Sequence, residues 1–468
     1  MLLWITMVAH ATSMTLLPEH DVAALTAQLQ PGDTVTFMDG TYTLDAPLEW
    51  GFQGTEAKPV TLRAAPGAHP VFQVTYPGYA FALTDARYVT LDGLGVRGGA
   101  EGVGGVLVDG ALAANLTLTN LSATGLQLPA VRISTKAQFI EVRGLSVDSG
   151  ALGLVAGCAD GSCWLQDSVI ADGLFAGLTD ADRSAIELLG GPQGVTISDN
   201  VVANVAGGGV AVSSTAAGDP TRVVGNTVWR AGGNGITVGS RAVVQNNLIA
   251  QVSGEGLVVQ DLSAPLARVE IGFNTIYGAT VGAHLRRWDQ GAELAFIGNA
   301  VIQATGVALR VESPGTPSWA DATFVGNVLG GTIEGPAPSV GFDLEGSVAD
   351  LQDAEVGQLA PSASSRLIAA AADVAEELAP ALDWTGATRV RPHDAGALMD
   401  GSQTLALAAA KKVELLVADL PEDTGLPDDT GASPSGCSAA PKVPGHAAWF
   451  ALAILCLGRR HRREGLSR

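Results

Sequence analysis

Apolar positions recur in short runs between Ile197 and Leu329, and each run is built around an asparagine. An apolar residue stands three positions before the asparagine and another stands two positions after it, as in Ile197-Ser-Asp-Asn200-Val-Val. The six asparagines are Asn200, Asn226, Asn247, Asn274, Asn299 and Asn327, which lie 26, 21, 27, 25 and 28 residues apart. No unit shows the 3.6-residue apolar period of a helix, so the pattern predicts two or three short strands per unit.

Repeats of this length indicate stacked coils. Strands this short cannot bury a face alone, but coils stacked about 4.8 Å apart form parallel sheets around a shared apolar interior. The predicted fold is therefore an all-β parallel β-helix solenoid. Each asparagine follows the first strand of its coil, where a bend is expected, and its amide both donates and accepts. We expect the six amides to form a hydrogen-bonded ladder, although asparagine is also an ordinary turn residue.

Less regular units extend the repeat toward the N-terminus. Including these units, we expect roughly 11–12 coils, of which Thr34–Phe37 and Val60–Leu62 form the first strands. Asp21–Gln30 places Val22, Leu25 and Leu29 on one helical face, with Asp21 as N-cap, and predicts a helix that covers the open end of the solenoid.

The repeat stops near residue 345, and the composition then changes. Pro361–Leu382 is alanine-rich and partly helical in propensity, and residues 421–436 are acidic and rich in Gly and Pro, which predicts a disordered spacer. The expected divisions are a signal peptide (1–11), a β-helix with an N-terminal cap (12–345), a C-terminal cap region (346–420), the spacer (421–436) and a sorting or anchor tail (437–468).

Both ends of the chain have features of an exported protein. Met1–Ala11 is apolar and ends in Ala9-His-Ala11, a cleavage pattern of signal peptides, although an ordinary buried N-terminal segment would also fit. Gly436-Cys437 precedes the apolar run Ala447–Leu457 and then Arg459–Arg463. Eleven apolar residues are short for a stable membrane span, so this order predicts a processed sorting tail that meets the membrane before processing.

The net charge limits which partners the protein can bind, and the cysteines predict a disulfide. The net charge of −21, with only five lysines, argues against nucleic acid, which requires a basic surface. Cys158 and Cys163 enclose a small loop and are expected to form a disulfide if the chain is exported, the alternative being two free thiols. We expect a monomer.

Two resemblances can be assigned to particular segments. Pro31–Tyr42, Lys58–Gly67 and Tyr88–Leu94, together with the Asn coils and the end segment Asp383–Ala397, resemble right-handed parallel β-helix proteins of the pectate-lyase-like superfamily over about residues 20–400. That superfamily includes alginate lyases and chondroitinase B. The tail from Gly436 resembles the MYXO-CTERM sorting signal of bacterial surface proteins, which implies export, processing near Cys437 and surface retention.

The resemblance implies that a saccharide groove lies on the sheet that follows the asparagine bend. Alternation predicts two outward columns there: Arg132, Glu187, Ala211, Thr237, Val258, His284 and Ala308, and Asp109, Ser134, Ser213, Gly239, Gln260, Arg286 and Arg310. The expected groove residues are Arg132, Glu187, Thr237 and Gln260.

A uronate lyase needs a base for the C5 proton and a cation for the carboxylate. His284 could be the base, and Arg286 or Arg310 the cation. This departs from the lyases, which pair Lys with Arg near calcium, because the only lysine near the sheet is Lys136, several coils away. The alternative is that all three are solvated residues.

Asp180, Asp182 and Glu187 form an acidic cluster that could serve a glycosidase, hold calcium or simply line a surface loop. No cofactor is certain, and calcium is the one this cluster would suit. Trp229 and Trp288 fall outside the outward columns, so the sequence shows no strong aromatic platform for sugars.

The resulting hypothesis is a secreted, surface-retained β-helix that contacts extracellular polysaccharide in an envelope or adhesion role, either non-catalytic or with a vestigial site. The alternative is a polysaccharide lyase that cleaves acidic, uronate-containing glycans by β-elimination.

Overall fold

The computed structural model describes residues 11–399, apart from 99–100, 215–216, 261–265, 289–290 and 314–318. The chain divides into two units, Met1–Ala409 and Ala410–Arg468. The second unit, which holds the predicted spacer and tail, lies outside the described residues, as does most of the predicted signal peptide. The account below therefore concerns the first unit.

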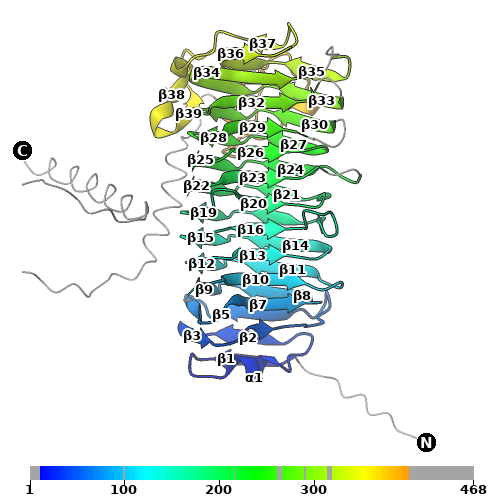
Figure 1. Ribbon diagram of the computed structural model, residues 1–468, viewed down its shortest axis with the longest axis vertical. Helices are drawn as coiled ribbons and strands as arrows, with labels where there is room; N and C mark the ends of the chain where they lie inside the picture. The colour runs from blue at the N-terminus through cyan, green and yellow to red at the C-terminus, as the bar shows by residue number, and fades with distance from the viewer. Residues whose placement is uncertain are drawn as a thin grey trace, which may run out of the picture. The chain divides into compact units, whose positions relative to one another are not determined.

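The described chain is a parallel β-solenoid of about eleven turns, as the sequence predicted. Figure 1 shows the strands following one another in chain order along the solenoid. Three stacks of parallel strands form its walls. The first stack is the 14-stranded sheet β1 (Ser13–Leu16), β2 (Thr34–Phe37), β5 (Val60–Ala64), β8 (Arg87–Asp92), β11 (Ala114–Thr119), β14 (Ala137–Arg143), β17 (Leu165–Gln166), β18 (Val169–Ala171), β21 (Thr196–Ser198), β24 (Thr221–Val224), β27 (Ala242–Gln245), β30 (Ala267–Gly272), β33 (Ala292–Ile297) and β35 (Ala322–Val325).

The other two stacks belong to one 23-stranded sheet. The second stack contains β3 (Gly40–Leu44), β6 (Pro70–Val74), β9 (Gly95–Gly98), β12 (Ser122–Thr124), β15 (Ser146–Asp148), β19 (Leu174–Ala176), β22 (Val201–Val205), β25 (Thr227–Ala231), β28 (Leu248–Ala250) and β31 (Thr275–Tyr277). The third stack contains β4 (Leu48–Glu49), β7 (Gly78–Thr84), β10 (Val103–Asp109), β13 (Val131–Ile133), β16 (Leu154–Ala156), β20 (Ser184–Leu188), β23 (Gly208–Val212), β26 (Ile236–Val238), β29 (Glu255–Val259) and β32 (Val281–Arg286). The long strands β34 (Ala300–Glu312) and β36 (Asn327–Glu334) continue both stacks, and β37 (Phe342–Asp343) pairs with β36.

The predicted asparagine ladder is present at the corner between the first and second stacks. All six side chains are buried, at 0–1% exposure. In each pair of neighbours, one Oδ1 accepts hydrogen bonds from the backbone N–H and the Nδ2 of the preceding asparagine at 2.9–3.1 Å. The residue before each asparagine has a positive φ, which turns the chain; three of these six residues are glycines. Local turn chemistry thus determines the corner.

The helical cap prediction is confirmed at its start and is too long at its end. α1 spans only Val22–Thr26, and the Asp21 side chain accepts from Ala24 N–H. The helix lies at the β1 end of the solenoid (Figure 1) and buries Thr26, whose Oγ1 accepts from Trp50 Nε1 at 3.0 Å. The prediction that the strands begin at Thr34 is wrong, because β1 precedes β2 and pairs with it in parallel.

After β37 the chain leaves the coil. β38 (Leu351–Asp353) and β39 (Gln358–Pro361) form an antiparallel pair, and the 3₁₀ turns are η2 (Val348–Asp350), η3 (Ala354–Val356) and η4 (Glu376–Leu378). The helical propensity of Pro361–Leu382 is realised only as turns and η4, because the segment packs against the solenoid rather than forming its own core.

The end segment is held by Arg389, which is buried. Its Nη2 donates to Asn246 Oδ1 and to the carbonyls of Gly396 and Ala397, and its guanidinium lies 4.5 Å from the ring centroid of Phe273. Burial lowers the pKa of Arg389 to about 10. The segment thereby covers Phe273, an aromatic residue at one of the corners with positive φ.

Candidate functional site

The predicted outward column of the third stack exists, with two corrections. The strand register aligns Arg132, Val155, Glu187, Ala211, Thr237, Val258, His284, Arg310 and Glu334. Val155 belongs to a coil that the sequence columns skipped. Arg310, not Ala308, stands beside His284, and Arg286 pairs with Glu312 instead of Arg310. The predicted column placed His284 and Ala308 side by side because each stands two positions after a glycine that opens an apolar run, Gly282 and Gly306. The prediction failed because the register matches Val281 with Val307 and so shifts this alignment by two residues.

His284 occupies the centre of a charged cluster on this outer face. Its Nδ1 lies 2.8 Å from Glu255 Oε1, and its Nε2 lies 3.0 Å from Glu312 Oε1. The side chain is only 1% exposed, although its neighbours Ala283 and Leu285 are the residues that face the core. His284 therefore points outward, as predicted, but is covered by the side chains around it.

The two arginines of the cluster are engaged by carboxylates and an amide. Arg286 Nη1 donates to Gln260 at 2.9 Å, and its Nε lies 3.7 Å from Glu312. Arg310 Nε donates to Glu334 at 2.8 Å, and its Nη1 lies 3.6 Å from Glu255. The structure thus brings His284, Arg286 and Arg310 together, as predicted, and adds the carboxylates that neutralise them.

This arrangement limits the chemistry of His284. A general base must reach the proton that it removes, and here each ring nitrogen already faces a carboxylate. A lyase also needs a cation for the substrate carboxylate, but Glu255, Glu312 and Glu334 already pair with the arginines. The cluster as it stands is a hydrogen-bonding surface of mixed charge.

The sequence reasoning missed Glu255, Glu312 and Glu334. Alternation assigns Glu255 to the inner side with Leu257, but Glu255 is the first residue of β29, where the chain leaves a corner. Its side chain can therefore reach His284 in the next coil. For Glu255, the available signal was an acidic residue directly before Gly256, which opens the apolar run 256–259.

The other predicted groove residues are partly engaged within the protein. Arg132 Nη1 donates to the Gly157 carbonyl at 2.9 Å, and burial lowers its pKa. Glu187 pairs with Arg183, and Thr237 Oγ1 lies 3.5 Å from Asn234 Nδ2. The polar groups of these residues are therefore partly used in contacts within the protein and are only partly available to a ligand.

The predicted calcium cluster is not assembled as a ligand set. Glu187 faces Arg183, and Asp180 Oδ1 accepts from Asp182 N–H. Within the described part of the chain, no group of three or more His, Cys, Asp or Glu side chains is placed to hold a metal ion. Calcium binding remains a prediction.

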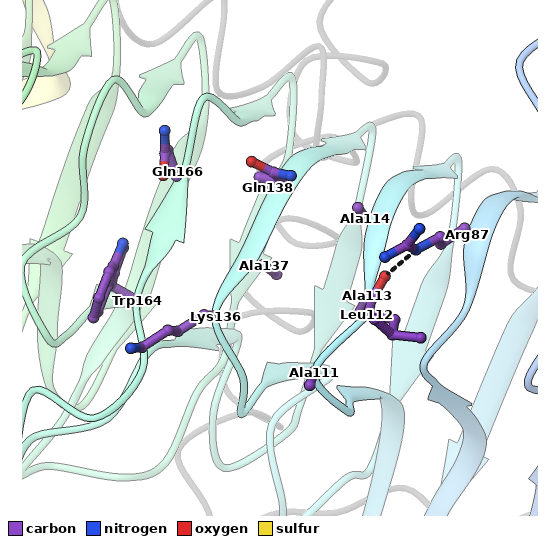
Figure 2. Close-up of a pocket in the computed structure, with 10 residues that line it drawn as sticks. All are labelled: Arg87, Ala111, Leu112, Ala113, Ala114, Lys136, Ala137, Gln138, Trp164 and Gln166. Carbon is purple, nitrogen blue, oxygen red and sulfur yellow. Dashed lines mark hydrogen bonds between the residues drawn. The ribbon is translucent and has the colours of Figure 1, made fainter.

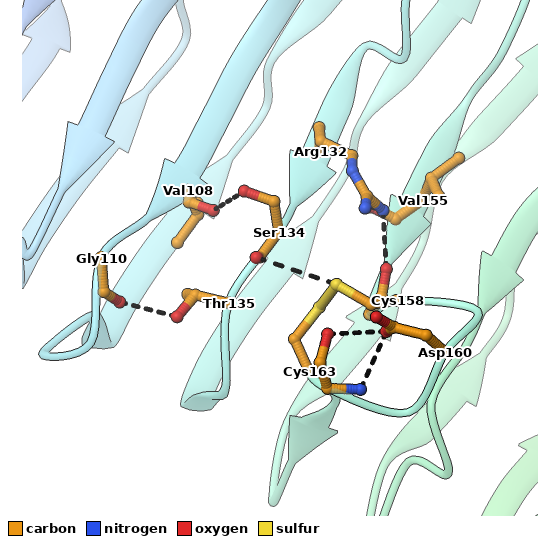
Figure 3. Close-up of a disulfide and its surroundings, with 11 residues drawn as sticks. Val108, Gly110, Arg132, Ser134, Thr135, Val155, Cys158, Asp160 and Cys163 are labelled. Carbon is orange, nitrogen blue, oxygen red and sulfur yellow. Dashed lines mark hydrogen bonds between the residues drawn. A yellow bond between two sulfur atoms is a disulfide. The ribbon is translucent and has the colours of Figure 1, made fainter.

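The predicted disulfide joins Cys158 and Cys163 in a loop between the third and first stacks (Figure 3). Cys158 N–H also donates to the Cys163 carbonyl, and Asp160 Oδ1 accepts from Ser162.

Of the tryptophans singled out by sequence, Trp288 lies in the core and Trp229 packs against the buried cluster beneath the end segment. Across residues 11–399 as described, no helix is long and apolar enough to cross a membrane.

Comparison with known proteins supports the fold. The family model for a right-handed β-helix region matches residues 129–301. Among solved structures, the chain is similar to a mannuronic acid specific polysaccharide family 6 lyase from human gut microbiota, at 16% identity and a TM-score of 0.51, covering 72% of this chain and 92% of that one. It is also similar to the A-module of a mannuronan C-5 epimerase of Azotobacter vinelandii, at 15% identity and a TM-score of 0.52, covering 68% and 91%.

At these identities the likeness concerns the fold. The comparison with curated proteins finds no match. The class that the fold defines is therefore the parallel β-solenoid, and the match to the right-handed β-helix model covers its residues 129–301.

Proposed function

We propose that the protein is exported and retained at the cell surface, where it binds extracellular polysaccharide on the outer face of the third stack without cleaving it. The observation that carries the proposal is the cluster around His284. Its charged groups are stacked on successive coils and partly exposed, with side-chain exposures of 31% for Arg286, 33% for Arg310 and 55% for Glu312. Paired carboxylates and guanidinium groups can hydrogen-bond sugar hydroxyls.

The non-catalytic part of the proposal rests on the burial of His284. At 1% exposure, the imidazole cannot approach a C5 proton unless one of the covering carboxylates, Glu312 at Nε2 or Glu255 at Nδ1, moves away. Export is supported by the disulfide, because such bonds persist in oxidising compartments. The Ala9-His-Ala11 pattern and the Cys437 tail support it from the sequence.

The test combines binding and turnover on the full-length chain. A panel of neutral and acidic polysaccharides is immobilised, and wild type is compared with Arg310→Gln and with Arg268→Gln. Arg268 is a matched control because it forms an exposed pair with Glu293 in the first stack. We expect binding to at least one glycan, weakened severalfold by Arg310→Gln alone. Equal binding by all three proteins, or none by wild type, contradicts the proposal.

A polysaccharide lyase is the second candidate, favoured by the fold shared with a polysaccharide lyase. It predicts ultraviolet absorbance from unsaturated uronate products, abolished by His284→Ala, and is tested with and without calcium. Any turnover by wild type would overturn the non-catalytic proposal. Turnover that survives His284→Ala would exclude this residue from the reaction.

A further inference from the structure

A surface hollow lies away from the third-stack cluster, where the chain enters the first stack. It has a volume of about 190 Å³, and its larger lining side chains are those of Arg87, Leu112, Lys136, Gln138, Trp164 and Gln166 (Figure 2). Its floor lies at Ala113, Ala114 and Ala137, whose side chains are buried, those of Ala113 and Ala137 in the core. The lining strands β8, β11, β14 and β17 are consecutive in the stack, so the hollow runs roughly 14 Å along the solenoid.

The aromatic end of the hollow is positioned by the disulfide loop. Trp164 directly follows Cys163, and its carbonyl accepts from Ala137 N–H at 3.2 Å, which draws it to the start of β14. Lys136 Nζ lies 4.3 Å from the centre of the Trp164 ring. This cation–π contact holds a long and otherwise mobile side chain in one place, so that less conformational entropy is lost when a ligand binds.

The charges of the hollow differ from those of the His284 cluster. There, each arginine pairs with glutamates, whereas neither Arg87 nor Lys136 forms an ion pair with the described residues. Arg87 Nε donates to the Leu112 carbonyl, which orients the guanidinium beside the exposed Leu112 side chain. In a chain with a net charge of −21, two cations without carboxylate partners at one hollow favour an anionic ligand.

Amide groups and apolar surface complete the lining. Gln166 Nε2 donates to Asp167 Oδ2 at 3.0 Å, which orients the Gln166 amide, and Gln138 is exposed on the neighbouring coil. The exposed Leu112 side chain and Trp164 supply apolar contact. Cations, amides and these two apolar side chains together suit a pyranose that carries a carboxylate, because such a sugar has both C–H faces and hydroxyls.

We propose that this hollow binds an acidic oligosaccharide, with carboxylates at Lys136 and Arg87, hydroxyls at Gln138 and Gln166, and C–H faces against Leu112 and Trp164. Arg87 is the first residue of β8, and Lys136 directly precedes β14, two coils further on and roughly 10 Å along the stack, a span that a disaccharide unit covers. This site goes beyond the function proposed above, since it lies where the chain enters the first stack and not on the outer face of the third stack, and its two cations favour a negatively charged ligand.

The test is calorimetric titration of the full-length protein with trigalacturonate and with its carboxyl-reduced counterpart. Wild type is compared with Lys136→Gln, Trp164→Ala and the matched control Arg143→Gln. Arg143 is an exposed cation on the same strand as the hollow floor, but it pairs with Glu141 and Asp172. Lys136→Gln alters an exposed side chain and so remains informative if Trp164→Ala fails to fold.

We expect trigalacturonate to bind more tightly than the carboxyl-reduced sugar and more weakly as salt is raised. Lys136→Gln should weaken binding about tenfold, the loss of one charge-assisted contact, and Arg143→Gln should leave it unchanged. Equal affinity for both sugars, unchanged binding by Lys136→Gln, or no binding overturns the inference. Binding that is instead lost in Arg310→Gln would support the third-stack site and reject this one, so the two proposals fail separately.

Discussion

Replacing Asn247 by alanine tests the claim that the ladder stabilises the solenoid. The Asn247 Oδ1 accepts from the backbone N–H and the Nδ2 of Asn226, and its Nδ2 donates to the Val223 and Gln245 carbonyls and to Asn274 Oδ1. Alanine can make none of these side-chain bonds.

The expected magnitude follows from the groups left without partners. Asn226 Nδ2 retains the Ile197 and Val224 carbonyls, but the buried Asn226 N–H loses its acceptor. A buried unsatisfied group costs about 1–3 kcal/mol, and the carbonyls that lose a donor and the small cavity add to this. We therefore expect Asn247→Ala to lower the free energy of unfolding by about 2–5 kcal/mol.

The control is Asn200→Ala at the end of the ladder. Asn200 Nδ2 also donates to the Ile170 carbonyl and to Asn226 Oδ1, but within the described residues the Asn200 Oδ1 accepts one bond, from Gly173 N–H, so its loss should cost less. Denaturant unfolding measures both variants, and hydrogen exchange reports the Asn226 amide locally. A cost below about 1 kcal/mol for Asn247→Ala, or an Asn226 amide that stays as protected as in wild type, would refute the reasoning.

Three further predictions concern other parts of the solenoid. Arg389→Ala should free the end segment, with a loss of about 3 kcal/mol from its charged hydrogen bonds; limited proteolysis should cleave near Asp383 in the variant and not in wild type. Burial raises the pKa of Tyr277 to about 12 and that of Tyr76 to about 12. The folded protein therefore binds protons more tightly than the unfolded chain. The contribution of these two groups to stability should be fully present below about pH 10, and the thermal unfolding midpoint should fall between about pH 10 and 12. Tyr277→Phe should reduce that fall, and a fall of unchanged size would exclude Tyr277 as a contributor. Replacing Cys158 and Cys163 by serine should destabilise the fold by about 2 kcal/mol, from the entropy of a short closed loop, as the unfolding midpoint measures.

Only part of the candidate site could be predicted from the sequence. Alternation placed His284 and Arg286 outward, because strand geometry is local. The partner of each side chain is set by the register between coils, which depends on the irregularity between Ile302 and Val307 within β34. Arg310 therefore came to lie beside His284 only in the folded coil, and Glu255 reached it from a corner where alternation does not apply.

The sequence by itself determined the stacked-coil fold, the asparagine corner and the Asp21 cap, because each depends on residues close together in the chain. The tertiary structure alone decided which charges meet. Asn246 contacts Arg389 across 143 residues, and the hollow between Arg87 and Trp164 is assembled from four coils. Such contacts depend on how coils of unequal length stack on one another. The spacing of a repeat along the sequence does not specify that stacking.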